Sequence, residues 1–189
     1  MHRLIVSLLA AALVFSGTAK AQDAGGFGVD ELRGGLFFHS VDNAPAGSAF
    51  LDTSRLQDVN VELLFTPLNQ GEWRWLGAFR PHVGATVNLG GLESQLYAGL
   101  SWTWHIMDGP VFIEGSLGGT IHNGAENGAS FPARNLGCSP MFRESASIGY
   151  QFTEQASIMA TVEHSSHAGL CGSDNQGITN LGVRVGWKF

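Results

Sequence analysis

The sequence contains few charged residues and little that favours a helix-built or nucleic-acid-binding protein. Only 14% of its 189 residues are charged, whereas a soluble domain usually carries about a quarter. The net charge is −6 and no basic cluster is present, which argues against nucleic-acid binding. After residue 21 no apolar run approaches the roughly 18 residues that a membrane-spanning helix needs. The hydrophobic share of 44% argues against disorder.

Glycine, by contrast, is abundant. The 26 glycines are about twice the share found in an average soluble domain. The length suits one domain. Together these features predict a glycine-rich, mostly β protein with an unusually apolar surface or core.

The N-terminus has the pattern of a secretory signal peptide. Arg3 provides a positive start, Leu4 to Phe15 form an apolar run, and Ala19-Lys20-Ala21 fits the small-x-small cleavage pattern. We therefore expect residues 1–21 to be removed and residues 22–189 to form the mature protein. The alternative, an uncleaved anchor helix, is disfavoured because the apolar run is short for a span.

The chain contains only two cysteines, Cys138 and Cys171. Export into an oxidising compartment permits a disulfide between them, which would add about 3–4 kcal/mol of stability. A metal site would need more Cys or His residues at ligand spacing. We expect a disulfide and no metal.

Alternation of apolar and polar residues, the signal of a half-buried strand, recurs along the mature chain. In the segment 94–106, Leu96, Leu100, Trp102 and Trp104 share one face, while glutamine, glycine, hydroxyl and histidine side chains share the other. This alternation predicts eight strands, at residues 29–40, 55–66, 79–89, 94–106, 110–122, 141–152, 156–166 and 179–189.

A soluble sandwich would turn the apolar face inward, whereas a membrane barrel turns it toward lipid. Three features favour the barrel. The chain is predicted to be exported, Trp102 and Trp104 lie on the apolar face beside Trp73 and Trp75, and the last strand ends in the aromatic Phe189. The fold prediction is therefore all-β, an eight-stranded antiparallel transmembrane β-barrel over residues 22–189, in the bacterial outer membrane. A secreted β-sandwich or lipocalin-like binder is the competing fold, and its exposed tryptophans argue against it.

The predicted links add detail to the barrel. The long links 41–54, 123–140 and 167–178 fall at one end, which we expect to face outward, and two of them carry the cysteines. A barrel of about eight strands is filled by side chains, which makes a porin role improbable. On the lumen face, glycines are expected to relieve crowding, and the charges of Glu62, Glu114, Arg143 and Arg184 are expected to neutralise one another.

One predicted strand, residues 156–166, carries polar residues on the face that is otherwise apolar. The parity of Ile158, Ala160 and Val162 continues into His164 and Ser166, which puts a histidine beside a hydroxyl on the lipid-facing side. A histidine can act as general base to a serine nucleophile, and at the outer rim this pair would meet an acyl ester of a lipid. The alternative is a polar rim cluster at the membrane interface. The remaining candidates, His39, His82, His105 and His122, are interpreted as barrel-filling or rim residues.

The segment His164-Ser165-Ser166-His167-Ala168-Gly169-Leu170, followed by Asn175-Gln176-Gly177-Ile178, resembles the active-site segment of the lipid A 3-O-deacylases, the PagL family. That family pattern is His-x-Ser-Asn-Ala-Gly, then Asn-x-Gly, then an acidic residue. The resemblance implies that Ser166 is the nucleophile and that His164 takes its proton and later protonates the leaving 3-hydroxyl. Such general-base help is worth about 10²–10⁴-fold in rate.

The chain departs from the family pattern at two places. His167 stands where the family has Asn, an oxyanion-hole candidate, and an imidazole N–H can replace that donor or simply support the rim. At the position where the family has the acid, this chain has Thr179, followed by Asn180. Thr179 can accept a hydrogen bond from His164. Asp174, in the preceding loop, is a candidate acidic substitute. Loss of the acid usually lowers the rate of a triad heavily without abolishing it.

Two functions remain in competition at this point. The resemblance implies an outer-membrane lipid A deacylase that acts on lipopolysaccharide without a cofactor, whereas the altered positions allow a non-enzymatic barrel with a structural or adhesion role. The sequence leaves the oligomeric state open.

Overall fold

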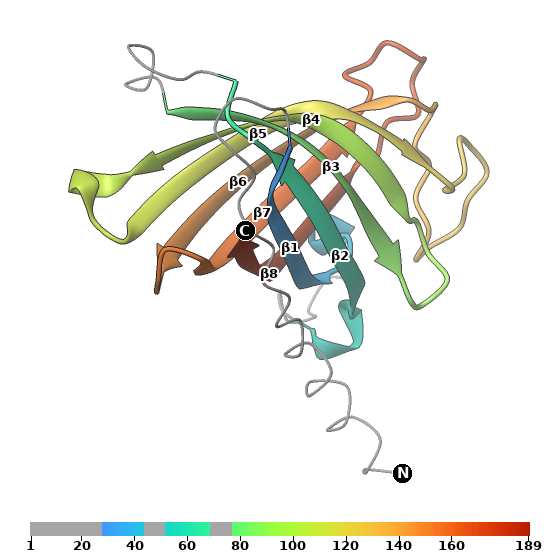
Figure 1. Ribbon diagram of the computed structural model, residues 1–189. Helices are drawn as coiled ribbons and strands as arrows, with labels where there is room; N and C mark the ends of the chain where they lie inside the picture. The colour runs from blue at the N-terminus through green and yellow to red at the C-terminus, as the bar shows by residue number, and fades with distance from the viewer. Residues whose placement is uncertain (1–27, 44–51, 69–76) are drawn as a thin grey trace.

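The computed structural model describes residues 28–43, 52–68 and 77–189. Eight antiparallel strands follow one another around a closed barrel, and β8 pairs with β1 to complete it (Figure 1). The strands are β1 (Val29–Phe38), β2 (Leu56–Phe65), β3 (Ala78–Asn88), β4 (Gln95–His105), β5 (Val111–His122), β6 (Met141–Gln151), β7 (Ala156–Ser166) and β8 (Ile178–Lys188). The described parts of the links contain three short 3₁₀ helices, η1 (Val41–Asn43), η2 (Thr53–Arg55) and η4 (Ile106–Asp108).

The predicted strands and the predicted fold class are confirmed, since every strand ends within two residues of its expected boundary. The closed antiparallel topology also removes the sandwich alternative. Across the described ranges, no helix is long and apolar enough to cross a bilayer. The predicted signal peptide at 1–21 and the tryptophans Trp73 and Trp75 lie outside the described residues.

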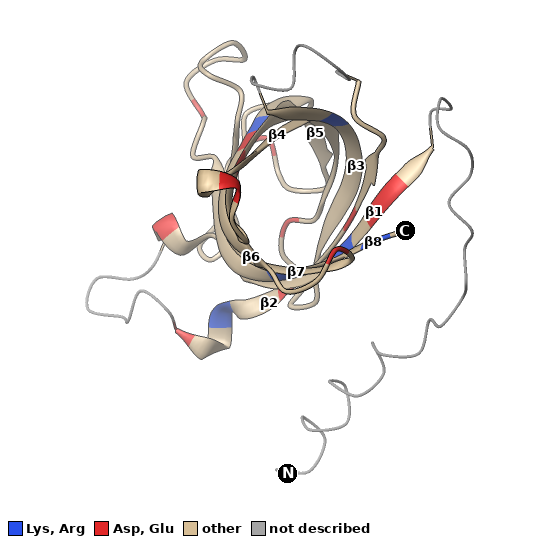
Figure 2. Cartoon of the chain, turned by 60° about the vertical axis from the view of Figure 1, so that its left-hand side comes forward, with Lys and Arg blue, Asp and Glu red and all other residues tan. Residues whose placement is uncertain are grey.

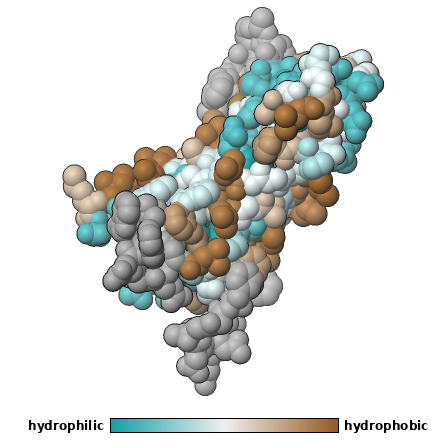
Figure 3. All heavy atoms as spheres, turned by 90° about the horizontal axis from the view of Figure 1, so that it is seen from above, coloured by the Kyte–Doolittle hydropathy of each residue, from teal (hydrophilic) through white to brown (hydrophobic). Residues whose placement is uncertain are grey.

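The outer face of the barrel is apolar. Leu36, Val61 and Val185 are about half exposed although each is aliphatic, and Figure 3 shows hydrophobic side chains spread over the side of the molecule with hydrophilic ones gathered toward one end. Trp104 and Trp187 lie near the ends of β4 and β8 at the barrel end with the short turns. An apolar band with aromatics at its edge is the surface of a barrel that faces lipid.

Charged residues lie along the barrel wall (Figure 2), and most of their side chains in the strands are buried in the lumen. Arg33 forms ion pairs with Glu31, Glu62 and Glu114, and all four side chains are buried. A second group consists of Arg143 and Arg184, both paired with Glu163; Arg184 also lies 3.6 Å from Glu62. The expected neutralisation of lumenal charges is confirmed, and it keeps ionised groups from being buried without partners.

Glycines make room for these large side chains. A Cβ atom added at Gly84 would lie 2.5 Å from the ring of Tyr97, closer than such atoms approach one another in proteins. The Tyr97 hydroxyl in turn donates to Glu62, and the guanidinium of Arg143 stacks 3.6 Å from the Tyr97 ring centre. The high glycine content therefore reflects, at this position, a lumen packed to contact.

The links at residues 123–140 and 167–177 lie side by side at one end of the barrel (Figure 1). A disulfide joins Cys138 to Cys171, with the two Cα atoms 6.0 Å apart. This confirms the predicted pairing. The second of these links connects β7 to β8 and carries the segment that resembles an active site.

Candidate active site

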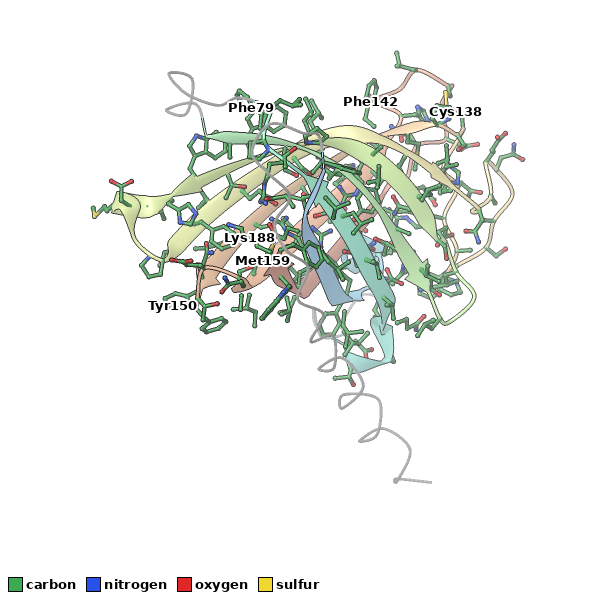
Figure 4. The ribbon with its side chains drawn as sticks, in the orientation of Figure 1. Phe79, Cys138, Phe142, Tyr150, Met159 and Lys188 are labelled. Carbon is green, nitrogen blue, oxygen red and sulfur yellow. A yellow bond between two sulfur atoms is a disulfide. The ribbon has the colours of Figure 1, made fainter. Side chains whose placement is uncertain are left out.

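The candidate site lies on the outer face of β7, next to the disulfide-bonded links. His164 and Ser166 share one face of the strand and are half-buried, whereas the residues between and beside them, Glu163 and Ser165, are buried in the lumen. The pair therefore has the outward orientation that strand parity predicts. In Figure 4, Phe142, the cross-strand partner of Ser166 on β6, lies at the same end of the barrel as Cys138.

The imidazole of His164 is held by the neighbouring strand β8. Its Nδ1 lies 2.8 Å from Oγ1 of Thr179, which is the paired residue of His164 in the β7–β8 register. When Nδ1 carries the proton and donates it to Thr179, the lone pair resides on Nε2. This tautomer is the one that a general base needs on its reactive nitrogen.

Gly177 shapes the other side of this ring. Its φ of +64° is in the left-handed region, and a Cβ atom there would lie 2.9 Å from Cε1 and 3.3 Å from Nε2 of His164. A side chain at this position would therefore displace the imidazole, and the backbone would resist it as well. The ring extends from Thr179 toward Gly177, which is the direction in which Ser166 follows His164 along β7.

His167 is engaged inside the β7–β8 link. Its ring is buried; Nε2 donates to the backbone oxygen of Asp174 at 2.6 Å, and Nδ1 accepts from the N–H of Cys171 at 3.3 Å. The His167 backbone N–H donates to Asn175 Oδ1. Because these donors are already used, the geometry favours a supporting role for His167 over an oxyanion-binding role. Both sulfurs near this ring belong to the disulfide, so they are not available as thiolate metal ligands.

The other sequence-predicted residues lie away from His164 and Ser166. Asn180 faces the lumen, where it accepts from the N–H of Ser40 and donates to Glu163. Asp174 is exposed in the link and contributes its backbone oxygen to the His167 contact. The structure thus brings together His164, Ser166 and Thr179 on one outer surface.

Glu144 of β6 is a further residue of this surface, and it was not among the residues predicted from the sequence. This residue is exposed on the outer face and is the direct register partner of His164 on the side opposite Thr179. The parity of Phe142, Ala146 and Ile148, which are exposed in the same strand, is a sequence signal that would have found it. His164 therefore has a threonine on one neighbouring strand and a glutamate on the other.

Arg134, in the link between β5 and β6, ties this region to the rest of the outer end. Its Nε donates to the backbone oxygen of Gly177 at 2.8 Å, and its Nη2 donates to the oxygen of Gln176 and to Asp42. The backbone N–H of Arg134 donates to Glu93. The chain that enters β8, and with it Thr179, is therefore held by Arg134 of the β5–β6 link, and Arg134 is held in turn by Asp42 and Glu93 of two other links.

An apolar groove runs along the outer face near the site. Its lining includes small residues, Ala98 and Gly119, between larger ones, Val83, Leu96, Ile121 and Pro140. The register connects this groove with the site, because Ser166 pairs with Phe142, Phe142 with Gly119, and Gly119 with Ala98. The groove therefore lies in the same cross-strand row as the candidate nucleophile.

The sequence of this chain matches a known protein family. A family model described as lipid A 3-O-deacylase (PagL) matches residues 58–188. The chain belongs to this family. No curated protein matches it in sequence.

Solved structures agree on the architecture of this PagL family member. The outer membrane enzyme PagL superposes with a TM-score of 0.57 at 17% identity, over 84% of this chain and 99% of that one. Neisserial surface protein A gives a TM-score of 0.54 at 14% identity, over 89% and 100% of the two chains. The N-terminal β-barrel domain of Pseudomonas aeruginosa OprF gives 0.50 at 13% identity, over 86% and 99%. The protein is an outer-membrane β-barrel.

Proposed function

We propose that this protein is a serine esterase that removes the 3-O-linked hydroxyacyl chain of lipid A. The observation that carries the proposal is the outward-facing pair of His164 and Ser166, with Nδ1 of the histidine bonded to Thr179. Membership of the lipid A 3-O-deacylase family supports the same reaction class. The substrate is a lipid of the surrounding membrane, so it approaches the barrel from its outer face.

The proposed chemistry follows from the two side chains. The Ser166 oxygen forms a bond to the ester carbonyl carbon while its proton passes to Nε2 of His164. When the tetrahedral intermediate collapses, the bond to the 3-oxygen breaks and that oxygen takes the proton from His164. Water then hydrolyses the acyl-serine with His164 again as base, which restores the free enzyme. These steps need no cofactor.

The apolar groove supports the choice of a lipid ester. A fatty acyl chain needs an apolar surface to lie on, and the groove over Ala98 and Gly119 lies in the same cross-strand row as Ser166, with Phe142 between them. A hydroxyacyl chain that extends from the Ser166 hydroxyl along this row would keep its hydrocarbon on the barrel surface.

The test is to express the protein in a bacterium whose lipid A carries 3-O-linked hydroxyacyl chains and to record lipid A mass spectra. The wild type is expected to remove one hydroxyacyl group, and Ser166→Ala and His164→Asn are expected to leave lipid A unchanged. Ser165→Ala is a matched control, because Ser165 faces the lumen, where its hydroxyl donates to Gln95. That variant should deacylate like the wild type.

Unchanged lipid A with the folded wild-type protein would contradict the proposal and favour the alternative, a non-enzymatic barrel with a structural or adhesion role. Deacylation by Ser166→Ala would refute the assignment of the nucleophile. Folding of each variant is verified by the faster migration of unheated barrel protein in SDS gels.

A further inference from the structure

Glu144 stands out on the outer surface because it is charged. Apart from His164, the only other acid or base with this orientation among the described residues of the eight strands is Asp30 at the start of β1, and its carboxylate accepts from the lumenal Arg80. Toward β5 and along β6, the neighbours of Glu144 on the outer face are apolar: Leu117, Phe142 and Ala146. A carboxylate that faces lipid is energetically unfavourable unless another group stabilises it.

The group that faces Glu144 is His164. The two residues are direct cross-strand partners, and the Cβ atoms of such partners lie about 4.5–5.5 Å apart. A glutamate side chain spans that separation easily. Nδ1 of His164 is bonded to Thr179 on the far side, so the hydrogen bond that selects the tautomer comes from Thr179.

The other nearby acids are committed elsewhere. Glu163, next to His164 in sequence, points into the lumen and bonds to Arg143, Arg184 and Asn180. Asp174 is exposed in the β7–β8 link and meets His167 through its backbone. Thr179, on the strand where the family pattern places an acid, carries no charge. Of the carboxylates described near the site, Glu144 is the one on the face of His164.

We propose that Glu144 is a positioning residue that supplies, from β6, the negative charge that stabilises protonated His164 during the reaction. This inference rests on the proposed esterase function. As the Ser166 proton moves to Nε2, the imidazole becomes a cation, and a negative charge on the neighbouring strand favours that form. The division of labour is then unusual for a triad: Thr179 on β8 orients the ring and Glu144 on β6 balances its charge.

The test compares Glu144→Gln with the wild type in purified, detergent-solubilised protein acting on lipid A, as kcat and KM against pH. We expect kcat to fall about tenfold, because the change removes the opposite charge that stabilises the imidazolium formed during the reaction. The rise of activity with pH should move to lower pH, since His164 loses the charge that favours its protonated form. KM should not increase, because the change removes a negative charge from a surface that binds an anionic lipid.

Three variants sharpen the test. Glu154→Gln makes the same change at an exposed acid in the β6–β7 turn at the opposite end of the barrel, and it should behave like the wild type. Glu144→Asp should keep most of the activity. Thr179→Glu, introduced into Glu144→Gln, should restore activity by supplying a carboxylate from β8.

A Glu144→Gln protein with wild-type kcat and pH profile overturns the inference. If that result accompanies an active wild type and an inactive Ser166→Ala protein, the esterase function stands and only the role of Glu144 fails. If the folded wild type never releases a hydroxyacyl group, the function and the inference fail together.

Discussion

Oγ1 of Thr179 lies 2.8 Å from Nδ1 of His164, on the strand next to the one that carries the histidine. The threonine occupies the place at which the family pattern has an acid, and it makes the hydrogen bond to the histidine without carrying charge. The relationship separates two tasks that one carboxylate usually performs, orientation of the imidazole and stabilisation of its cation.

Replacement of Thr179 by Val is therefore expected to lower kcat without unfolding the barrel. The change removes the hydroxyl and keeps the β-branched shape, and one such hydrogen bond is worth about 1 kcal/mol, or roughly fivefold in rate. Thr179→Ser keeps the hydroxyl and should stay close to the wild type. Initial rates on purified lipid A measure the effect, and equal rates for the Val and Ser variants would argue against the orienting role.

Much of the fold follows from the sequence because lipid and lumen impose opposite preferences on alternate residues. In β4, Leu96 and Trp104 face outward while Gln95 and Tyr97 face the lumen, and the same contrast marks every strand. The parity of β7 likewise revealed His164 and Ser166, since polar side chains on the lipid face violate the rule.

The partners of these residues were harder to predict. The pairing of Glu144 with His164 depends on the register between β6 and β7, and a shift of one residue would turn Glu144 to the lumen. The contacts of Arg134 with Gly177 join links 43 residues apart in sequence, and no local pattern encodes them. Strand parity specifies faces, whereas the site also depends on register and on the packing of the outer links.

The groove beside the site gives a prediction about chain length. Gly119→Leu would fill the groove at its floor, and the backbone accepts the change because a Cβ atom there meets its nearest neighbour, the oxygen of Met141, at 3.7 Å. We expect activity on long-chain esters to fall about tenfold, with a smaller effect on short-chain esters.

Gly115→Leu is the matched control for this variant. Gly115 lies on the outer face of the same strand, away from the groove lining, and a Cβ atom there has no neighbour within 4 Å. Its rates on both esters should equal those of the wild type. Equal losses in the two variants would point to a general effect on the barrel surface and contradict a role for the groove.

The contacts of Arg134 predict that the β5–β6 link supports catalysis from a distance. Arg134→Met removes the hydrogen bonds to Gly177, Gln176 and Asp42, so the chain that enters β8 should exchange its amide hydrogens faster and Thr179 should hold His164 less well. We expect activity to fall several-fold, because a hydrogen bond to a charged group is worth about 1.5–3 kcal/mol. Hydrogen exchange of residues 167–179 and initial rates measure the two effects.

Arg55→Met serves as the control for this change. Arg55 belongs to η2 in another link and donates to the oxygen of Ser40, so its loss should leave both the exchange of residues 167–179 and the rate unchanged. If Arg134→Met exchanges like the wild type in this segment, Arg134 does not hold the site.

The outer end should also respond to pH through His39, which follows β1 and is buried. Burial lowers the pKa of His39, but hydrogen bonds with Asp58 and Glu93 outweigh it and raise this pKa to about 9. A pKa raised from 6.5 in the unfolded chain means that the stabilising contribution is full below about pH 6.5 and is lost as the pH rises through about 9. We expect the temperature midpoint of thermal unfolding of the wild type to decrease as the pH rises from about 7 to about 10.

Two histidine variants test this assignment. His39→Gln should be less stable at neutral pH and should lose most of this pH dependence. His105→Gln, at an exposed histidine at the other end of the barrel, should keep it. A slope that persists in His39→Gln would assign the pH response to other groups, because the charge of His39 is the one that Asp58 and Glu93 stabilise.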